Sequence, residues 1–340
     1  MRITIDDVAR LAGVAKSTVS RVINDSGPVS EITKKRVLDT IDLLKYKPDA
    51  LAVNLAKQET HTIGVLVPDI RNPFYANACW AAEKFARSQQ YAVLICNSDN
   101  DPKIEQFLFD FFQERRVDYL LSIGGSNDLT NIVNFAVSGT IPVVSVDRKI
   151  VGYNIPSLTF NNFAGGVMIA EHLLKAGHTR IAFATSDFTP AEVERRQGFE
   201  FALAKAGCPL DPRLTFVYTE EEWKEGKMLS LTAALKSNNR PTAIFTSNDL
   251  KAIAVYAIIY KMGLTIPKDI SIIGYDDIDT AQFMRPPLST VYQPIEEAIY
   301  KGVEILLSFD KTTRKENYLY EPRLIIRESL NSFDSGGKPE

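Results

Sequence analysis

The pattern of hydrophobic and polar positions at the start of the chain predicts three short helices. Thr4 with Asp7 has the form of an N-terminal capping box, and Gly13 follows the last apolar position of the first helix. The second helix has its apolar side chains at helical spacing, at Val19, Val22 and Ile23. A third helix is predicted from Ser30, a good N-cap, to a point before Pro48. Two helices joined by a glycine turn form the helix-turn-helix pattern.

The opposite side of the second helix is polar. Ser17, Arg21 and Asn24 lie on it, with Lys16 and Ser20 beside them. A short outward face with hydrogen-bond donors near the helix N-terminus is what recognition of base edges in the DNA major groove requires. A solvent-exposed helix face without a partner is the structural alternative.

From residue 63 onward the pattern changes to short apolar runs that alternate with amphipathic helical stretches. The runs cover residues 63–67, 92–96, 119–123, 142–146, 180–184, 242–246 and 270–274, with a further extended run at 288–291. Such alternation predicts an α/β fold with parallel sheets that carry helices on both faces. About 270 residues are too many for one such sheet, so we expect two similar lobes with a boundary near Asn161 and a cleft between them.

Polar residues stand at the carboxyl ends of these runs, which is where open α/β sheets bind ligands. They are Asp69, Asn97, Ser98, Asp147, Arg148, Thr185, Ser186, Ser247, Asn248, Asp249, Asp276 and Asp277. Taken singly, each would serve as a cap for the helix that follows. As a set they predict the polar rim of a small-molecule site.

Length and composition narrow the class of protein. A chain of 340 residues predicts roughly two to three domains, and 45% hydrophobic with 24% charged residues is ordinary for a chain that buries sizeable cores. The cysteines Cys79, Cys96 and Cys208 form no Cys-x-x-Cys pair, so a disulfide framework and a zinc knuckle have no support. The chain starts without a signal-like apolar segment and contains no run of membrane-spanning length. We expect a reduced, cytoplasmic protein.

The charge distribution and the motifs of the sequence indicate which kinds of partner and ligand the chain binds. The net charge is −3, but residues 1–60 carry ten Lys and Arg against eight Asp and Glu. An excess of two positive charges indicates nucleic-acid binding only if the cationic side chains lie together on one face. The sequence contains no Gly-x-Ser-x-Gly, Gly-x-Gly-x-x-Gly or Walker motif. His172 and His178 are six residues apart, not the four that place two metal ligands on one helix face. We expect neither enzymatic activity nor a metal or cofactor.

Several separated motifs occur together in both halves of the chain. They are residues 4–9 (Thr-Ile-Asp-Asp-Val-Ala), Gly13-Val14 with residues 18–24, Tyr46-Lys47-Pro48, Pro68-Asp69-Ile70 with Asn72-Pro73-Phe74-Tyr75, Gly177-His178, Asn248-Asp249 and residues 272–277 (Ile-Ile-Gly-Tyr-Asp-Asp). Over essentially its whole length the chain resembles the LacI/GalR family of bacterial transcriptional repressors. The resemblance implies a helix-turn-helix domain followed by a two-lobed effector domain like that of periplasmic binding proteins.

The resemblance also implies which residues contact DNA. The second helix would lie in the major groove, with Lys16 and Ser17 at base edges and Arg21 at a base or a phosphate. The other residues implied to contact DNA are Thr4, Thr18, Ser20, Asn24, Ala52 and Leu55. Ala15 stands where the family usually has Ser, which removes a helix cap worth about 1 kcal/mol.

Residues 49–56 resemble the hinge helix of the family, and Leu55 aligns with the leucine that the family wedges into the minor groove. A helix of this length is marginal in water, so we expect it to form only on DNA or against a partner hinge. Packing of Leu55 on the effector domain is an equal alternative.

For the effector cleft, the resemblance implies that Arg195 and Asp276 hold sugar hydroxyls, with Asn248 beside them. The residues implied to surround the sugar ring are Phe74, Tyr75 and Phe160. This chemistry suits a polyol, because a carboxylate accepts from adjacent hydroxyls and a guanidinium donates in a planar fork. Glu221 stands where many family members have a stacking aromatic, which argues against a purine-like effector.

The sequence at Asp147-Arg148 resembles that of the branch of the family that responds to sugar acids. An anionic ligand needs cations, and Arg71, Arg148 and Arg195 would supply them. Surface salt bridges explain Arg71 and Arg148 equally well.

We interpret the chain as a homodimeric DNA-binding repressor of carbohydrate metabolism that binds a near-palindromic operator and a small sugar or sugar acid. The expected segments are 1–48 for DNA binding, 49–60 for the hinge and linker, 61–330 for effector binding and dimerisation (lobe one 61–160 and 292–320, lobe two 161–291 and 321–330), and 331–340 for a flexible tail. That tail is too short and polar for the leucine heptads of tetrameric relatives, so we expect a dimer. The alternatives are a cytoplasmic sugar-binding protein without a DNA function, a regulator with a non-sugar, purine-like effector, and an enzyme on the same two-lobed scaffold.

Overall fold

The chain is described by a computed structural model that covers residues 3–46, 59–125, 128–186, 189–309 and 316–332. It divides into two compact units, Met1–Thr60 and His61–Glu340, and each is described by itself. None of the helices in the described ranges combines the length and the hydrophobicity needed to cross a bilayer.

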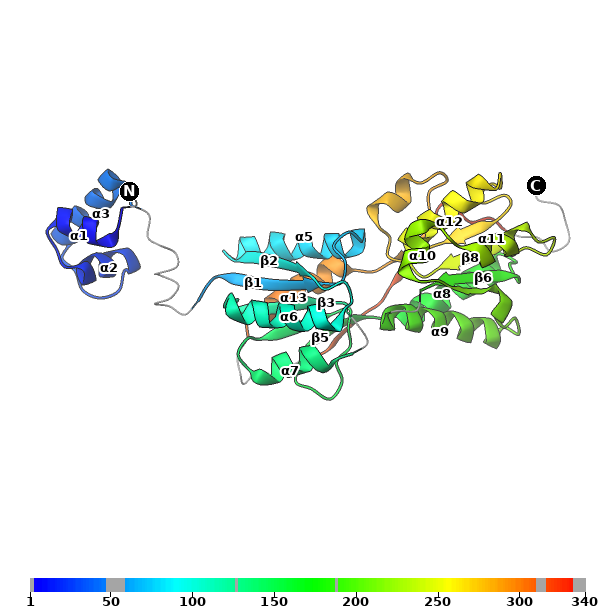
Figure 1. Cartoon of the computed structure of the whole chain (residues 1–340), viewed down its shortest axis with the longest axis horizontal. Helices are drawn as coiled ribbons and strands as arrows, with labels where there is room; N and C mark the ends of the chain where they lie inside the picture. The colour runs from blue at the N-terminus through cyan, green and yellow to red at the C-terminus, as the bar shows by residue number, and fades with distance from the viewer. Residues whose placement is uncertain (1–2, 47–58, 126–127, 187–188, 310–315, 333–340) are drawn as a thin grey trace. The chain divides into compact units, whose positions relative to one another are not determined.

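The described residues of the first unit, 3–46 with Glu59 and Thr60, contain three helices, which are labelled in Figure 1. They are α1 (Ile5–Ala12), α2 (Lys16–Asn24) and α3 (Glu31–Leu44). Their core consists of the buried side chains Val8, Ala9, Ala12, Val19, Val22 and Val37. The predicted capping box is present: the Thr4 N–H donates to Asp7 Oδ2 at 3.0 Å, and the Thr4 hydroxyl accepts from the Asp7 N–H. Gly13 ends α1 with a φ of 62°, a left-handed conformation that favours glycine.

Lobe one of the second unit is built on a six-stranded parallel sheet of order β11-β5-β4-β3-β1-β2. Its strands are β1 (Thr62–Val67), β2 (Ala92–Asn97), β3 (Tyr119–Ile123), β4 (Val143–Val146), β5 (Ser157–Phe160) and β11 (Tyr318–Tyr320). Its helices are α5 (Pro73–Ser88), α6 (Pro102–Glu114), α7 (Thr130–Ser138) and α13 (Ile295–Leu307). Helices α5 and α13 pack together against one face of the sheet, and α6 and α7 against the other (Figure 1).

Lobe two repeats this plan with a four-stranded parallel sheet of order β7-β6-β8-β9. Its strands are β6 (Ile181–Thr185), β7 (Thr215–Val217), β8 (Ala243–Thr246) and β9 (Ser271–Ile273). Its helices are α8 (Asn162–Lys175), α9 (Pro190–Lys205), α10 (Glu220–Glu225), α11 (Leu229–Lys236) and α12 (Asp249–Lys261), with 3-10 turns at Pro212–Leu214 and Asp279–Phe283.

Three segments of chain join the two lobes. The first follows β5, the second runs through β10 (Thr290–Tyr292) into α13, and the third leads from β11 to β12 (Arg323–Ile325). Strands β10 and β12 pair antiparallel, and the Asn161 N–H donates to the Tyr320 carbonyl at 2.9 Å. The joining segments are therefore tied to one another by backbone hydrogen bonds.

The seven strands expected between residues 63 and 274 are present, each within one residue of its predicted bounds. The run at 288–291 corresponds to β10, displaced by up to two residues. Strands β5, β7, β11 and β12 were not predicted, because none of them lies in an apolar run of the kind from which the other strands were predicted.

The tightest helix packing of lobe two is between α8 and α9. A Cβ on Gly166 of α8 would collide with the backbone carbonyl of Arg195, and a Cβ on Gly198 of α9 would collide with that of Phe163. Backbone atoms cannot turn aside as a side chain can, so these two glycines allow the helices to approach so closely.

We expect Gly198→Ala to lower the free energy of unfolding by about 1 to 3 kcal/mol, because the added methyl group forces α8 and α9 apart. Urea denaturation of the two proteins measures this difference. The matched control is Gln197→Ala at the exposed neighbouring position of α9, which should stay within about 0.5 kcal/mol. Equal stability of Gly198→Ala and the control would contradict the close helix contact.

Candidate functional site

The polar face of α2 is exposed. Lys16, Ser17, Arg21 and Asn24 are exposed, while Thr18 and Ser20 are partly buried. Lys16 Nζ lies 3.0 Å from Asp6 Oδ2, but both side chains are more than half exposed, so the pair is weak and can exchange for a DNA phosphate. The exposed Thr4 side chain is engaged in the capping box.

The start of α2 lacks a side-chain cap. Ala15 is the N-cap residue, and its methyl group accepts no hydrogen bond, as the sequence predicted. Backbone N–H groups of the first helical turn need an acceptor from elsewhere, and a phosphate oxygen is a suitable one. Ala52 and Leu55, two of the residues predicted to contact DNA, lie outside the described residues.

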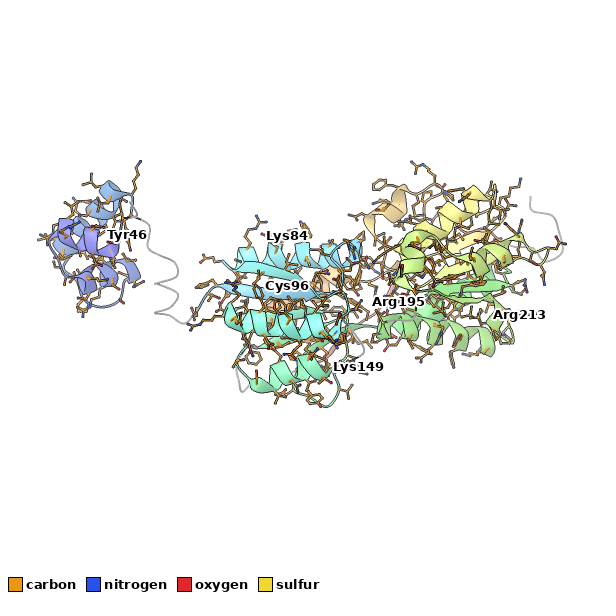
Figure 2. The ribbon with its side chains drawn as sticks, viewed as in Figure 1. Tyr46, Lys84, Cys96, Lys149, Arg195 and Arg213 are labelled. Carbon is orange, nitrogen blue, oxygen red and sulfur yellow. The ribbon has the colours of Figure 1, made fainter. Side chains whose placement is uncertain are left out.

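In the second unit, the two lobes line a cleft with a volume of about 970 Å³. Six of the predicted effector residues line it: Phe74, Tyr75, Asp147, Arg195, Asn248 and Asp276. They belong to the carboxyl ends of β4, β8 and β9, to the first turn of α5 and to the second turn of α9. Figure 2 labels Arg195 at the junction of the two lobes.

Arg195 is 4% exposed and is one of the residues that line the cleft. Its Nε donates to Asn162 Oδ1 at 2.8 Å, and Nη1 donates to the Ser247 carbonyl at 2.7 Å. Nη2 lies 3.3 Å from Asp276 Oδ1, and the guanidinium carbon stands 3.8 Å from the centre of the Tyr275 ring. Together these contacts fix the plane of the guanidinium group.

Asp276 has one carboxylate oxygen in contact with two protein groups. Gln293 Nε2 donates to Oδ1 at 2.8 Å, the same oxygen that faces Arg195. Burial raises the pKa of Asp276 to about 6, although the charges of Arg195 and Lys251 act to lower it. Gln293 was not predicted from the sequence, because nothing in the local pattern around it shows that the segment after β10 passes beside β9.

Asp147 ends β4 in a left-handed conformation with a φ of 58°. Burial raises its pKa to about 7; Arg195 opposes that shift, and the nearby carboxylates of Asp276 and Glu194 add to it. Its Oδ1 has no hydrogen-bond partner among the described residues. This oxygen of Asp147 can therefore accept a hydrogen bond from a hydroxyl group of a ligand in the cleft.

A buried ion pair that was not predicted from the sequence adds to the polar lining of the cleft. Lys251 Nζ lies 2.6 Å from Glu192 Oε1, and the hydroxyl groups of Ser247 and Ser186 also donate to Glu192. Burial alone would raise the pKa of Glu192, but Lys251 and these hydrogen bonds outweigh it and hold the pKa at about 2. The available signal was that both charged residues occupy the third position of a helix that follows a strand, α9 and α12.

Two residues of the predicted effector set do not line the cleft. Arg148 is buried, with Nη1 at 3.0 Å from Glu105 Oε1 and Nη2 bonded to the Asp128 carbonyl, so its guanidinium group is engaged inside lobe one. Phe160 packs edge-on against Phe74 at a centroid distance of 6.3 Å and is 2% exposed, so it supports the aromatic wall from behind.

The aromatic and acidic residues of α10 also differ from the expected pattern. Glu221 does not line the cleft, whereas Trp223 does, and its indole N–H has no partner among the described residues. Within the same residues, no group of three His, Cys, Asp or Glu side chains could hold a metal ion.

The comparisons with known proteins agree with both halves of this description. Residues 4–49 match the model of bacterial regulatory proteins of the lacI family, and residues 170–330 match a periplasmic binding protein-like domain. The ribose operon repressor of Haemophilus influenzae is 35% identical over 97% of this chain and 99% of its own length. The chain belongs to the LacI family of bacterial regulatory proteins. It is a DNA-binding transcriptional repressor.

Other regulators are similar over 80% or more of the chain. The HTH-type transcriptional regulator DegA of Bacillus subtilis is 34% identical over 98% of this chain and 100% of its own length. A solved LacI-family regulator of Enterococcus faecium with bound ribose is 28% identical and has a TM-score of 0.71, over 80% of this chain and 100% of that one. The lac repressor dimer bound to operator, at 24% identity and a TM-score of 0.85 over 97% of this chain and 100% of that one, shows the same fold.

The raised pKa of Asp147 predicts how the stability of this LacI-family chain depends on pH. The folded protein keeps the proton up to a pH of about 7, whereas the unfolded chain releases it near the ordinary value of 3.8. The folded state therefore binds more protons in that window, so stability falls as pH rises through it. We expect Asp147→Asn to reduce this fall and to be more stable than the wild type at pH 8, by on the order of 2 kcal/mol.

Urea denaturation between pH 5 and pH 8 measures this slope. The control is Asp211→Asn, because hydrogen bonds from Arg213 hold the pKa of Asp211 at about 2 and its contribution is lost only at lower pH. An unchanged slope in Asp147→Asn would show that Asp147 is ionised in the folded protein throughout this range.

Proposed function

We propose that this repressor acts as a homodimer whose two helix-turn-helix units bind the half-sites of a near-palindromic operator, and that a small neutral sugar in the cleft controls that binding. The observation that carries the proposal is the buried Arg195–Asp276 pair in the wall of a cleft lined by both lobes. A carboxylate and a guanidinium fixed side by side offer an acceptor and a donor to adjacent hydroxyl groups.

The charges of the cleft favour a neutral sugar over a sugar acid. Arg195 faces Asp276 at 3.3 Å, Lys251 faces Glu192 at 2.6 Å, and Arg71 faces Asp69 at 2.7 Å. A carboxylate on the ligand would have to compete with these protein carboxylates, whereas a hydroxyl group can join them without displacing a charge. The sugars bound in two related solved structures, ribose and cellobiose, are also neutral.

Control by the sugar follows from where the cleft lies. Its walls come from both lobes, so a bound sugar stabilises whichever arrangement of the lobes brings the two walls into contact with it. If one arrangement also positions the two DNA-binding units better, the sugar and the operator change each other's affinity by the same factor. The chain works in the cytoplasm, where its operator is, and we assign it no catalytic role.

For the operator, we propose contacts from Thr4, Lys16, Ser17, Thr18, Ser20, Arg21 and Asn24, with Ala52 and Leu55 from the segment outside the described residues. The exposed face of α2 supports the major-groove contacts. Base-contacting and phosphate-contacting side chains in this set differ in how they respond to sequence and to salt.

We expect Arg21→Ala and Lys16→Ala to weaken operator binding in different ways. Loss of a base contact should weaken operator binding by about 1 to 3 kcal/mol and relax specificity at one position, while loss of a phosphate contact weakens binding to all sequences and lowers the salt dependence. Gel-shift titrations at several salt concentrations separate the two. Lys35→Ala on the exposed side of α3 is the control, and binding by all three variants equal to wild type would contradict the assignment to α2.

We expect Asp276→Asn and Arg195→Ala to bind operator normally and to lose sugar affinity by at least about tenfold, because each removes one partner of a desolvated, charge-assisted hydrogen bond. Calorimetry with D-ribose and D-ribonate tests this, with Asp110→Asn on the exposed side of α6 as the control. A wild-type preference for ribonate that Arg195→Ala abolishes would replace the neutral sugar by a sugar acid. Unchanged affinity in both variants would show that the effector binds elsewhere.

A further inference from the structure

The loop that carries Asp276 has an unusual backbone. Asp276 and Asp277 follow β9 with φ values of 107° and 53°, two consecutive positive values at residues other than glycine. Such conformations are strained and persist only where the surrounding structure holds them. The contacts on either side of these two residues therefore determine where the Asp276 carboxylate lies.

Asp249 contacts the loop on both sides of the strained pair. Its backbone N–H donates to the Tyr275 carbonyl at 2.8 Å, and its Oδ2 accepts the Ile278 N–H at 3.0 Å. Tyr275 and Ile278 are the residues directly before and after Asp276 and Asp277. One buried residue thus joins the two ends of a four-residue loop.

The second oxygen of Asp249 connects the loop to the segment that joins the lobes. Oδ1 accepts the Thr290 hydroxyl at 2.7 Å, and Thr290 is the first residue of β10. The Thr290 hydroxyl in turn accepts the Asp277 N–H at 3.3 Å. Asp249 and Thr290 form one hydrogen-bonded unit around the loop.

The Asp249 carboxylate is buried away from the cleft, next to a glycine. Asp249 is fully buried and is not one of the residues that line the cleft, so it does not reach an effector there. A Cβ on Gly274 would collide with Asp249 Oδ1, so a glycine at that position leaves room for the carboxylate. The Asp249 carboxylate therefore contacts the loop and not a ligand in the cleft.

We propose that Asp249 is a positioning residue for effector binding, which holds the loop 275–278 in the strained conformation that places Asp276 beside Arg195 in the cleft. This inference rests on the proposed function, because it takes Asp276 to be a group that binds the sugar. Without the hydrogen bonds with Asp249 the loop relaxes, and the Asp276 carboxylate is no longer held in the position in which it binds the sugar hydroxyls.

The test uses the full-length repressor and calorimetry with D-ribose, D-xylose, D-glucose and cellobiose, and continues with the sugar that binds most tightly to the wild type. Asp249→Asn keeps the shape of the side chain but only one acceptor oxygen, and Thr290→Val keeps the shape and removes the hydroxyl group. We expect each variant to weaken sugar affinity about tenfold while operator binding is retained.

The control for a merely structural effect is Ser329→Ala. The buried Ser329 hydroxyl donates to the Ile272 carbonyl at 2.6 Å and accepts the Ser289 N–H at 2.7 Å, so its removal deletes as many hydrogen bonds from the same lobe without touching the loop. We expect this variant to lose stability in urea and to keep the sugar affinity of the wild type.

A double-mutant cycle gives the decisive measurement. If Asp249 acts through Asp276, then Asp249→Asn changes sugar affinity little in an Asp276→Asn background. An equal loss in both backgrounds, or an equal loss in Ser329→Ala, overturns the positioning role. Sugar binding that depends on Asp276 but not on Asp249 overturns this inference alone, whereas a wild type that binds none of the sugars overturns the proposed function with it.

Discussion

The burial of one guanidinium group constrains the whole of lobe two. Arg195 has almost no access to water, so its charge depends on Asn162, the Ser247 carbonyl, Asp276 and the Tyr275 ring for what hydration would otherwise supply. A buried charge left without partners destabilises a protein by several kcal/mol, about 3 to 5 when one partner of a pair is removed. The start of α8, the end of β8 and the loop after β9 must therefore meet α9 at one point, and the effector chemistry is located at that point.

Glycine makes that meeting possible. Gly166 lies against the backbone carbonyl of Arg195, and a side chain there would push α9, together with its arginine, away from α8. The neighbouring Gly165 leaves room for the Tyr275 ring on which the guanidinium rests. Packing and binding chemistry are thus coupled in this lobe: the close approach of α8 and α9 that stabilises the fold also sets the position of the group that meets the ligand.

The DNA-binding unit depends on a different balance. Its fully buried side chains are six alanines and valines, and the larger apolar side chains, among them Ile23, Ile41 and Leu44, are only partly buried against them. Local interactions therefore carry a larger share of its stability, among them the capping box at Thr4 and the Ser30 cap of α3, each worth about 1 kcal/mol. This leaves one side of α2 free of any packing role, and its polar residues are available to a partner.

Local sequence determined the parts of this protein that depend on near neighbours along the chain. The capping box, the glycine turn, the uncapped start of α2 and the seven predicted strands of the two sheets all follow from periodicity and from side chains a few residues apart. The rule that parallel strands end at one edge of a sheet was enough to bring Asp147, Asn248 and Asp276 to one cleft. Only the tertiary structure decided which charged group faces which. Arg148 is paired with Glu105 inside lobe one, Lys251 with Glu192, and Gln293 with Asp276, across separations of 43, 59 and 17 residues. A side chain a few ångströms long can choose among several partners, and that choice depends on the packing of whole helices and on where the chain crosses between the lobes, which no local pattern records.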